Sequence, residues 1–213
     1  MKINAINLAT RQVMTNQGGT FETGIYKQPL GESVFVSSQG LEGDAIVDLA
    51  VHGGPDQAVY IYLQEDYDWW SEQLGKCLKP GTFGENVIIE GLADKNIVIG
   101  DILSINQLVL EITAPRVPCH KLASVMGSAI FVQQFIAANR PGFYGRVKQQ
   151  GTISVGDEVT YTATVQECAS IKDVFHVWHV KDKPLATLKK ALGSPLAINY
   201  RRKIEAWYNQ DLA

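Results

Sequence analysis

The chain has 213 residues, of which 46% are hydrophobic and 19% are charged, and its net charge at pH 7 is −3. This size and apolar content are typical of a globular protein with a sizeable core, built as one large domain or as one domain with a small appendage. The lack of a basic tail or Lys/Arg run argues against binding to a nucleic acid polymer. No apolar stretch is long enough to cross a bilayer.

The three cysteines, Cys77, Cys119 and Cys168, are widely spaced and odd in number. A disulfide framework is therefore not expected, and a reducing compartment fits this cysteine usage best. The N-terminal residues lack the sustained apolar segment of a signal peptide. We therefore expect a cytoplasmic protein that is not attached to a membrane.

The first two-thirds of the chain have the pattern of short strands separated by glycine turns. The strand-like stretches are INAIN (3–7), AIVDLAV (45–51), ILSI (102–105), LVLEIT (108–113) and EVTYTA (158–163). Two helices are predicted among them, at 64–75 and 128–140, the second of which Pro141 ends. The pattern predicts a mixed but mainly β fold, either a β-barrel or a strongly bent sheet, with peripheral helices.

Helical signals replace strand signals after about residue 164. Three short helices are predicted at 170–180, 184–193 and 195–210, with Ser170 as an N-cap and Gly193 as a C-terminal cap. Pro184 and Pro195 suit first helical turns. Such a module is small for an independent core, so it should pack on the β-domain. We therefore divide the chain into a β-domain at 1–163 and a three-helix domain at 164–213.

The stretch PRVPCHKLAS, from 115 to 124, places Cys119 among cationic neighbours. The thiolate is the reactive form of cysteine, and Arg116, His120 and Lys121 supply positive charge that favours it. The two prolines would present the sulfur on a stiff loop at a sheet edge. The stretch alone leaves two interpretations open, a reactive thiol or a loop cysteine beside ordinary surface cations.

Three further glycine turns could approach a ligand closely. VHGGPDQAVYIY (51–62) and GTFGENVIIEG (81–91) combine flexible backbone with His52, Glu85 and Asn86. GIYKQPLG (24–31) places Lys27 where it could meet a phosphate. Taken singly, each stretch is better explained by an ordinary turn with a solvated side chain. No zinc-type pair, Walker A motif, dinucleotide fingerprint or G-x-S-x-G motif is present.

Taken in order, these stretches resemble the MOSC domain, the module named after the C-terminal part of molybdenum-cofactor sulfurase. The resemblance is carried by LEGDAIVDLAVHGGPDQAVYIY, GTFGENVIIEGL, IVIGDILSI, ITAPRVPCHKL, RPGFYGRV and GTISVGDEV. The last three predicted helices resemble the small 3-alpha domain of the YiiM-like subfamily. The resemblance thus covers nearly the whole chain and implies a MOSC-type β-barrel followed by a three-helix domain.

The resemblance also implies a function. Similar proteins bind a molybdenum cofactor of the molybdopterin type, rather than pyridoxal phosphate, and reduce N-hydroxylated compounds to amines. Substrates of this class include 6-N-hydroxylaminopurine, hydroxylamines and amidoximes. Because no flavin or iron–sulfur motif is present, electrons would come from a separate flavin or iron–sulfur reductase. A monomer or homodimer is expected.

By the same resemblance, Cys119 is the catalytic thiolate and the ligand to molybdenum. The residues that fall on family motif positions around the pterin and its phosphate are Lys27, His52, Gly53, Gly54, Phe83, Gly84, Glu85, Asn86, Arg116 and Lys121. Two other functions would use the same residues. Cys119 could carry a persulfide for delivery to another metal centre, or the protein could bind a molybdopterin without catalysis.

Overall fold

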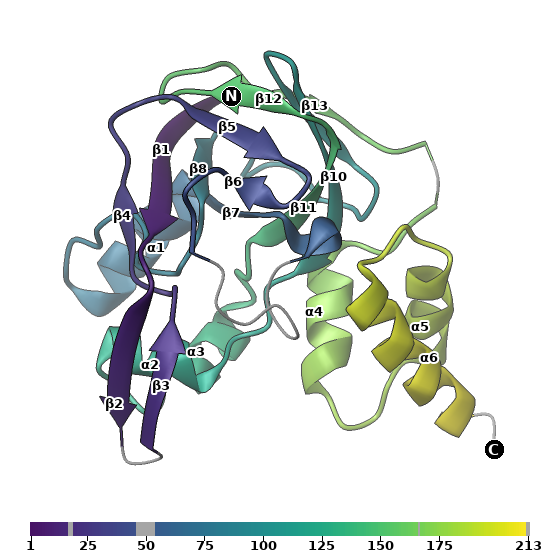
Figure 1. Cartoon of the computed structure of the whole chain (residues 1–213). Helices are drawn as coiled ribbons and strands as arrows, with labels where there is room; N and C mark the ends of the chain where they lie inside the picture. Colours follow the sequence, from purple (N-terminus) through teal and green to yellow (C-terminus); the bar gives the residue numbers. More distant parts are fainter. Residues whose placement is uncertain (17–18, 46–53, 166, 212–213) are drawn as a thin grey trace.

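The computed structural model describes residues 1–16, 19–45, 54–165 and 167–211 (Figure 1). Its main sheet has eight strands in the order β13-β9-β10-β11-β7-β8-β1-β4. These strands are β1 (Lys2–Ala9), β4 (Lys27–Pro29), β7 (Val59–Leu63), β8 (Val87–Glu90), β9 (Ile102–Ile105), β10 (Leu108–Pro115), β11 (Phe143–Gln149) and β13 (Thr160–Thr162). Neighbours are antiparallel except β7 and β8, which run parallel.

Two smaller sheets complete the β structure. One contains β12 (Gly151–Ile153), β5 (Val34–Ser37) and β6 (Gly40–Leu41), and the other is the hairpin of β2 (Gln12–Asn16) and β3 (Gly19–Thr23). The helical elements are η1 (Pro55–Gln57), α1 (Gln64–Leu74), α2 (His120–Met126), α3 (Phe131–Ala138), α4 (Ile171–His179), α5 (Leu185–Leu192) and α6 (Ile198–Asp211). The mixed, mainly β class is therefore confirmed.

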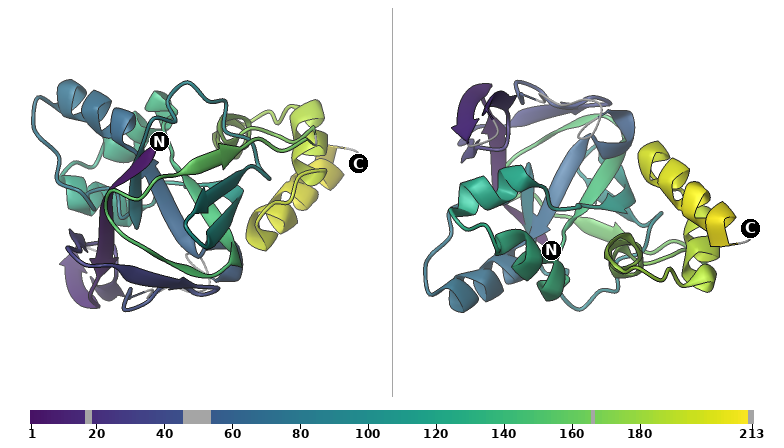
Figure 2. Two further views of the ribbon diagram at one scale, coloured as in Figure 1. Left: turned by 90° about the horizontal axis from the view of Figure 1, so that it is seen from above. Right: turned by 90° about the horizontal axis from the view of Figure 1, so that it is seen from below.

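The expectation of a β-barrel is wrong, because no sheet closes on itself in the described part of the chain. The cause lies in β1. One edge of β1 pairs with β8, while the other edge pairs with β4 only over Asn7–Ala9. At its start, β1 reaches the segment before β13 through a single bridge between Lys2 and Glu158. This short contact is no continuous ladder, so the sheet stays open although it is strongly curved (Figures 1 and 2).

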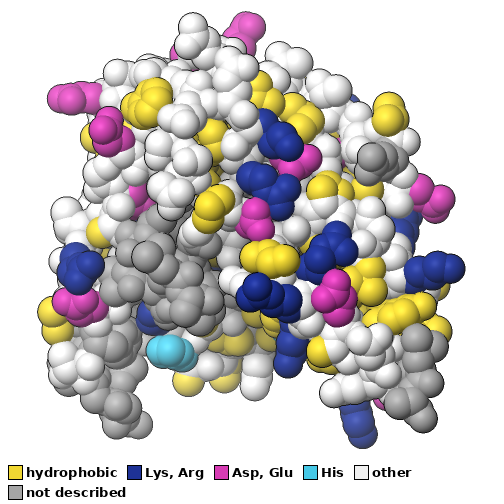
Figure 3. All heavy atoms as spheres, turned by 45° about the vertical axis from the view of Figure 1, so that its right-hand side comes forward, with side chains coloured by type: hydrophobic (Ala, Val, Ile, Leu, Met, Phe, Trp, Pro, Cys, Tyr) yellow, Lys and Arg dark blue, Asp and Glu magenta, His cyan; other side chains and the backbone are white. Residues whose placement is uncertain are grey.

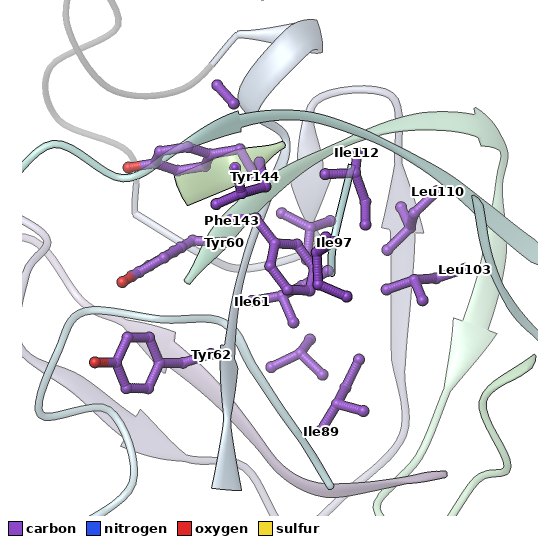
Figure 4. Packing of buried hydrophobic residues seen from close by; sticks show 14 of the residues in the cluster. Tyr60, Ile61, Tyr62, Ile89, Ile97, Leu103, Leu110, Ile112, Phe143 and Tyr144 are labelled. Carbon is purple, nitrogen blue, oxygen red and sulfur yellow. The ribbon is translucent and has the colours of Figure 1, made fainter. Parts of the chain in front are cut away.

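The strand β7 separates two kinds of packing. Its residues alternate across the sheet, so Ile61 points into an aliphatic core with Ile89, Leu103 and Leu110, while Tyr60 and Tyr62 point to the other side (Figure 4). On that other side, aromatic rings of the helices α1 and α3 and of the loop before β8 cover the sheet. They are Tyr67, Trp70, Phe83, Phe131 and Phe135, whose neighbouring ring centroids lie 5.0–6.4 Å apart.

The helices α4, α5 and α6 lie together at one end of the sheet (Figures 1 and 2). Backbone hydrogen bonds tie them to it, from Ile171 N–H to the Ile97 carbonyl and from Ala197 N–H to the Thr113 carbonyl. Their apolar faces belong to the same buried cluster as the strands. Lys and Arg side chains lie among hydrophobic ones on this part of the surface (Figure 3). The division into two domains at residue 163 stays a prediction.

Local signals located several helices correctly. The helix α1 matches its prediction and ends at Gly75 in the left-handed conformation. Helix α3 is shorter than predicted, whereas α2 was not predicted at all, because the two prolines before Cys119 suggested a loop. Gly193 follows α5 as expected but keeps right-handed angles. The strand expected at 45–51 falls largely outside the described residues.

No single helix in the described ranges is long and apolar enough to span a membrane. The helices α2 and α3 reach the required length and apolar content only when they are counted together, and the chain bends by 105° between them.

Helix α4 begins with a complete capping box. The Ser170 hydroxyl accepts a hydrogen bond from the Asp173 amide, and the Asp173 carboxylate accepts one from the Ser170 amide. We expect Ser170→Ala to lower the free energy of unfolding by about 1 kcal/mol, because the helix loses the acceptor for one N-terminal amide. Urea denaturation measures this change. Ser33→Ala, at an exposed loop position, is the control, and an equal effect of both variants would contradict the capping role.

Candidate functional site

The sheet brings together stretches that are far apart in the sequence. Strand β7 pairs with β8, so the chain after Gly54 runs beside the chain after Asn86. Its other neighbour is β11, where Tyr144 lies opposite Tyr60. Strand β10 pairs with the far side of β11 and leads directly into the Arg116–Cys119 loop. The predicted site stretches therefore meet around Tyr60.

Arg116 is buried, with only 4% of its surface exposed. Its guanidinium carbon lies 5.6 Å from the centre of the Tyr60 ring and 5.8 Å from that of Phe135, which are distances of cation–π contact. Its charge interacts with the Tyr144 side chain, and burial raises the pKa of Tyr144. Within the described part of the chain, the Nη1 atom of Arg116 is buried without a hydrogen-bond partner. A guanidinium is permanently charged, so this atom is a strong donor that the protein leaves unsatisfied.

Cys119 follows three residues later, at the point where β10 has ended and α2 begins. It is the N-cap residue of α2, with extended backbone angles, and its thiol is half-buried and not in a disulfide. The charge of Arg116 interacts with this thiol. Of the two other basic residues in the stretch, His120 is exposed and Lys121 is half-buried. The structure thus groups the half-buried Cys119 with Arg116.

Lys27 lies on β4 and is almost fully buried. Its ammonium forms an ion pair with Asp44 at 2.5 Å, and only 8% and 3% of the two side chains are exposed. Burial lowers the pKa of Lys27, while the Asp44 charge acts in the opposite direction. The same carboxylate accepts hydrogen bonds from the Ala9 amide and from the Asn86 side chain, both at 2.8 Å. Asp44 therefore holds Lys27 and Asn86 together.

Asn86 connects this ion pair to the centre of the site. Its side-chain oxygen accepts a hydrogen bond of 3.1 Å from the Tyr60 amide. Because the Tyr60 ring packs against Arg116, one strand residue links the Lys27 group to the Cys119 group. Tyr60 and Asp44 were not predicted as site residues. A buried lysine requires a buried partner, and that requirement was the signal that could have pointed to an acidic residue such as Asp44.

Glu85 is completely buried and accepts four hydrogen bonds. The donors are the Asn7 side chain at 3.1 Å, the Tyr67 hydroxyl at 2.7 Å, the Gly81 amide at 2.5 Å and the Phe83 amide at 3.1 Å. Burial raises the pKa of Glu85 to about 7, although these donors pull it down. The carboxyl group thus fixes the loop before β8.

The neighbouring predicted residues have different surroundings. The Phe83 ring is fully buried and lies 4.5 Å from the Tyr62 ring, within the aromatic cluster. Gly84 has a φ of +76°, and a side chain there would also press on Ile25. Gly54 precedes η1 with a φ of +79°. His52 and Gly53 lie outside the described residues. The cofactor contacts of all these positions stay predictions.

Comparison with known sequences identifies the family to which the chain is similar. Residues 48–160 match the model of the MOSC domain family. The protein named "Uncharacterized protein YflK" of Bacillus subtilis (strain 168) is 33% identical over 188 residues, which cover 88% of this chain and 85% of that protein. "Protein YiiM" of Escherichia coli (strain K12) is 30% identical over 165 residues, covering 73% and 71%. A protein of Gibberella moniliformis named "Reductase" is 31% identical over 183 residues, which are 84% of this chain but only 32% of that protein.

Solved structures agree in fold. The crystal structure of YiiM from Geobacillus stearothermophilus matches with a TM-score of 0.80 and 26% identity, over 97% of this chain and 98% of that one. YiiM from Escherichia coli matches with a TM-score of 0.76 and 21% identity, over 99% and 94%. Both likenesses extend through the C-terminal helices, because they cover nearly all of this chain.

The raised pKa of Glu85 makes a pH dependence testable. In the folded protein this carboxyl keeps its proton up to about pH 7, whereas its ordinary value is 4.5. Its contribution to stability is therefore complete below about pH 4.5 and is lost as the pH rises through 7. We expect the free energy of unfolding, relative to Glu85→Gln, to fall by on the order of 3 kcal/mol between pH 4.5 and 8.

Urea denaturation at several pH values measures this difference. Glu72→Gln, which changes an exposed carboxylate on α1, should leave the pH profile of the wild type unchanged. A profile of Glu85→Gln that runs parallel to the wild type would contradict the assignment.

Proposed function

Because the chain belongs to the MOSC domain family as a YiiM-like member, we propose that it binds a molybdenum cofactor of the molybdopterin type and acts as an oxidoreductase. Its substrates are N-hydroxylated compounds such as 6-N-hydroxylaminopurine, hydroxylamines and amidoximes, which it reduces to amines. A separate reductase supplies the electrons.

One observation carries the proposal, the buried guanidinium of Arg116 beside the half-buried thiol of Cys119. A buried cation with an unsatisfied Nη1 donor is costly unless an anionic acceptor joins it. The anionic oxygen atoms of a molybdopterin are acceptors of this kind, and a thiolate is a soft ligand of the kind that binds transition metals. The residues present therefore fit the cofactor that the family implies.

In this proposal the cofactor carries out the redox chemistry, and the protein residues bind and orient it. When bound, the cofactor supplies the two-electron chemistry that removes oxygen from an N–OH group. For a hydroxylamine, two electrons and two protons convert the N–OH group to N–H and release one water molecule. Cys119 would hold the metal, while Arg116 and Lys121 would hold anionic oxygen atoms. Arg116 also favours the thiolate form of Cys119 by its charge.

The second group of residues has a supporting role in the proposal. Lys27 would face the cofactor phosphate as a charge that Asp44 holds in place. Glu85 and Asn86 would fix the turn around Gly84, with their hydrogen bonds already made inside the protein. His52, Gly53 and Gly54 complete the set by their positions in the family motif.

The proposal also includes a separate protein as the source of electrons. The described part of this chain contains no group of three or more His, Cys, Asp or Glu side chains that could hold a metal ion. The similar protein named "Reductase" is about three times as long as the segment that it shares with this chain. This supports the proposal that a MOSC unit of this type works beside a reductase, which here would be a separate protein.

The proposal is tested with Cys119→Ser in protein purified from cells that make the cofactor. We expect this variant to lose bound molybdenum and to lose at least about 100-fold of the reduction of 6-N-hydroxylaminopurine, as ligand changes at metal sites do. Elemental analysis and turnover with a chemical reductant measure the two effects. Cys77→Ser, which changes an exposed thiol, is the matched control and should retain both.

Equal molybdenum content and equal turnover in wild type and Cys119→Ser would contradict the proposal. Wild-type protein without molybdenum but with a labile extra sulfur atom on Cys119 would favour the persulfide carrier instead. Mass spectrometry under non-reducing conditions detects that sulfur.

A further inference from the structure

Tyr200 connects the C-terminal helices to the loop that carries Arg116 and Cys119. It lies on α6 and is 6% exposed. Its hydroxyl donates a hydrogen bond of 2.5 Å to the Pro115 carbonyl. The phenol therefore contacts the backbone at the residue directly before Arg116.

The loop needs such support, because the sheet ends where it begins. The last pair in the ladder between β10 and β11 joins Pro115 to Phe143. Beyond it, residues 116–118 belong to no strand or helix before α2 starts at His120. Proline has no amide hydrogen, so Pro115 and Pro118 cannot donate backbone hydrogen bonds. The Tyr200 hydroxyl supplies a hydrogen-bond donor to this backbone at the position where the strand ladder ends.

The start of α6 is itself fixed on the sheet side. The Asp56 carboxylate accepts a hydrogen bond of 2.8 Å from the Ile198 amide and one of 2.7 Å from Arg146 Nε. Arg201 donates to the carbonyls of Leu192 and Ser194 at 2.8 and 2.7 Å. Tyr200 lies between these anchors, and its ring packs 4.6 Å from the Trp178 ring. The hydroxyl is thus held in place from outside the loop.

We propose that Tyr200 is a positioning residue, which holds Arg116 and Cys119 in the arrangement that receives the cofactor. The C-terminal helices then do more than cover the sheet, since they set the geometry of the metal-binding loop. The role of Tyr200 in cofactor binding rests on the proposed function. Its role in holding the loop through the Pro115 carbonyl, which we call the clamp, does not.

Tyr200→Phe tests the clamp, because it removes only the hydroxyl. Loss of one hydrogen bond worth about 1 kcal/mol makes local opening of the loop about fivefold more frequent. In cofactor-free, full-length protein carrying Cys77→Ser, we expect iodoacetamide to alkylate Cys119 about fivefold faster. Cys168 is buried, so its alkylation rate reports global opening and should not change.

The matched control is Tyr161→Phe, which removes a hydroxyl bonded to Asp101 at 2.6 Å and should leave the Cys119 rate unchanged. An unchanged Cys119 rate in Tyr200→Phe would overturn the proposal. A parallel acceleration of Cys119 and Cys168 would overturn it as well, because the hydroxyl would then support the fold in general. Hydrogen exchange of the peptide that contains residues 114–124 gives the same answer without a chemical label.

A second measurement addresses the cofactor. In molybdenum-loaded protein that a chemical reductant has brought to the Mo(V) state, we expect Tyr200→Phe to change the electron paramagnetic resonance spectrum of the metal. We also expect it to lower the molybdenum content, whereas Tyr161→Phe should change neither. Wild-type and Tyr200→Phe spectra that coincide would show that Tyr200 does not position the metal ligand. Wild-type protein that binds no molybdenum would contradict the proposed function, while the alkylation rates would still decide whether Tyr200 holds the loop.

Discussion

Glu85 lies entirely out of water, and a carboxyl group in that position must receive its hydrogen bonds from the protein. Its donors come from β1, from α1 and from its own loop, so three parts of the chain must come together before the group is satisfied. The next residue, Asn86, is thereby aimed at the Tyr60 amide. The position of the Tyr60 ring, and with it the contact with Arg116, follows from this requirement.

The two halves of the candidate site use buried charge in different ways. Lys27 is matched by Asp44, so this cation already has a partner inside the protein. Among the described residues, Arg116 has aromatic faces, a phenol and a thiol around it, and one of its nitrogen atoms has no acceptor there. A buried ion pair already satisfies its own charges inside the protein, whereas an unmatched donor favours the binding of an anion. For this reason Arg116, rather than Lys27, is the stronger candidate for binding an anion.

The parts of the fold that depend on neighbouring residues could be predicted from the sequence. The capping box at Ser170 and the left-handed end of α1 at Gly75 are local, and their residues identify them. The motif stretches with Gly84, Arg116 and Cys119 could be recognised for the same reason. The choice between the two predicted forms, a closed barrel and an open bent sheet, could not be made from the sequence, because it depends on how few residues of β1 pair with a second partner. Asp44, Tyr60 and Tyr200 were missed since each acts on a residue far away in the sequence.

The hydrogen bond from Tyr200 to Pro115 joins residues that are 85 positions apart. During synthesis, the strands and the loop with Cys119 leave the ribosome well before α6 exists. For that interval the loop lacks its anchor, even if the sheet around it has already formed. The order of events follows from this delay. If the loop binds a metal as proposed, the metal can be captured in its final geometry only after residue 200 has been made and folded back, and insertion of the cofactor would then be a late step in the maturation of the protein.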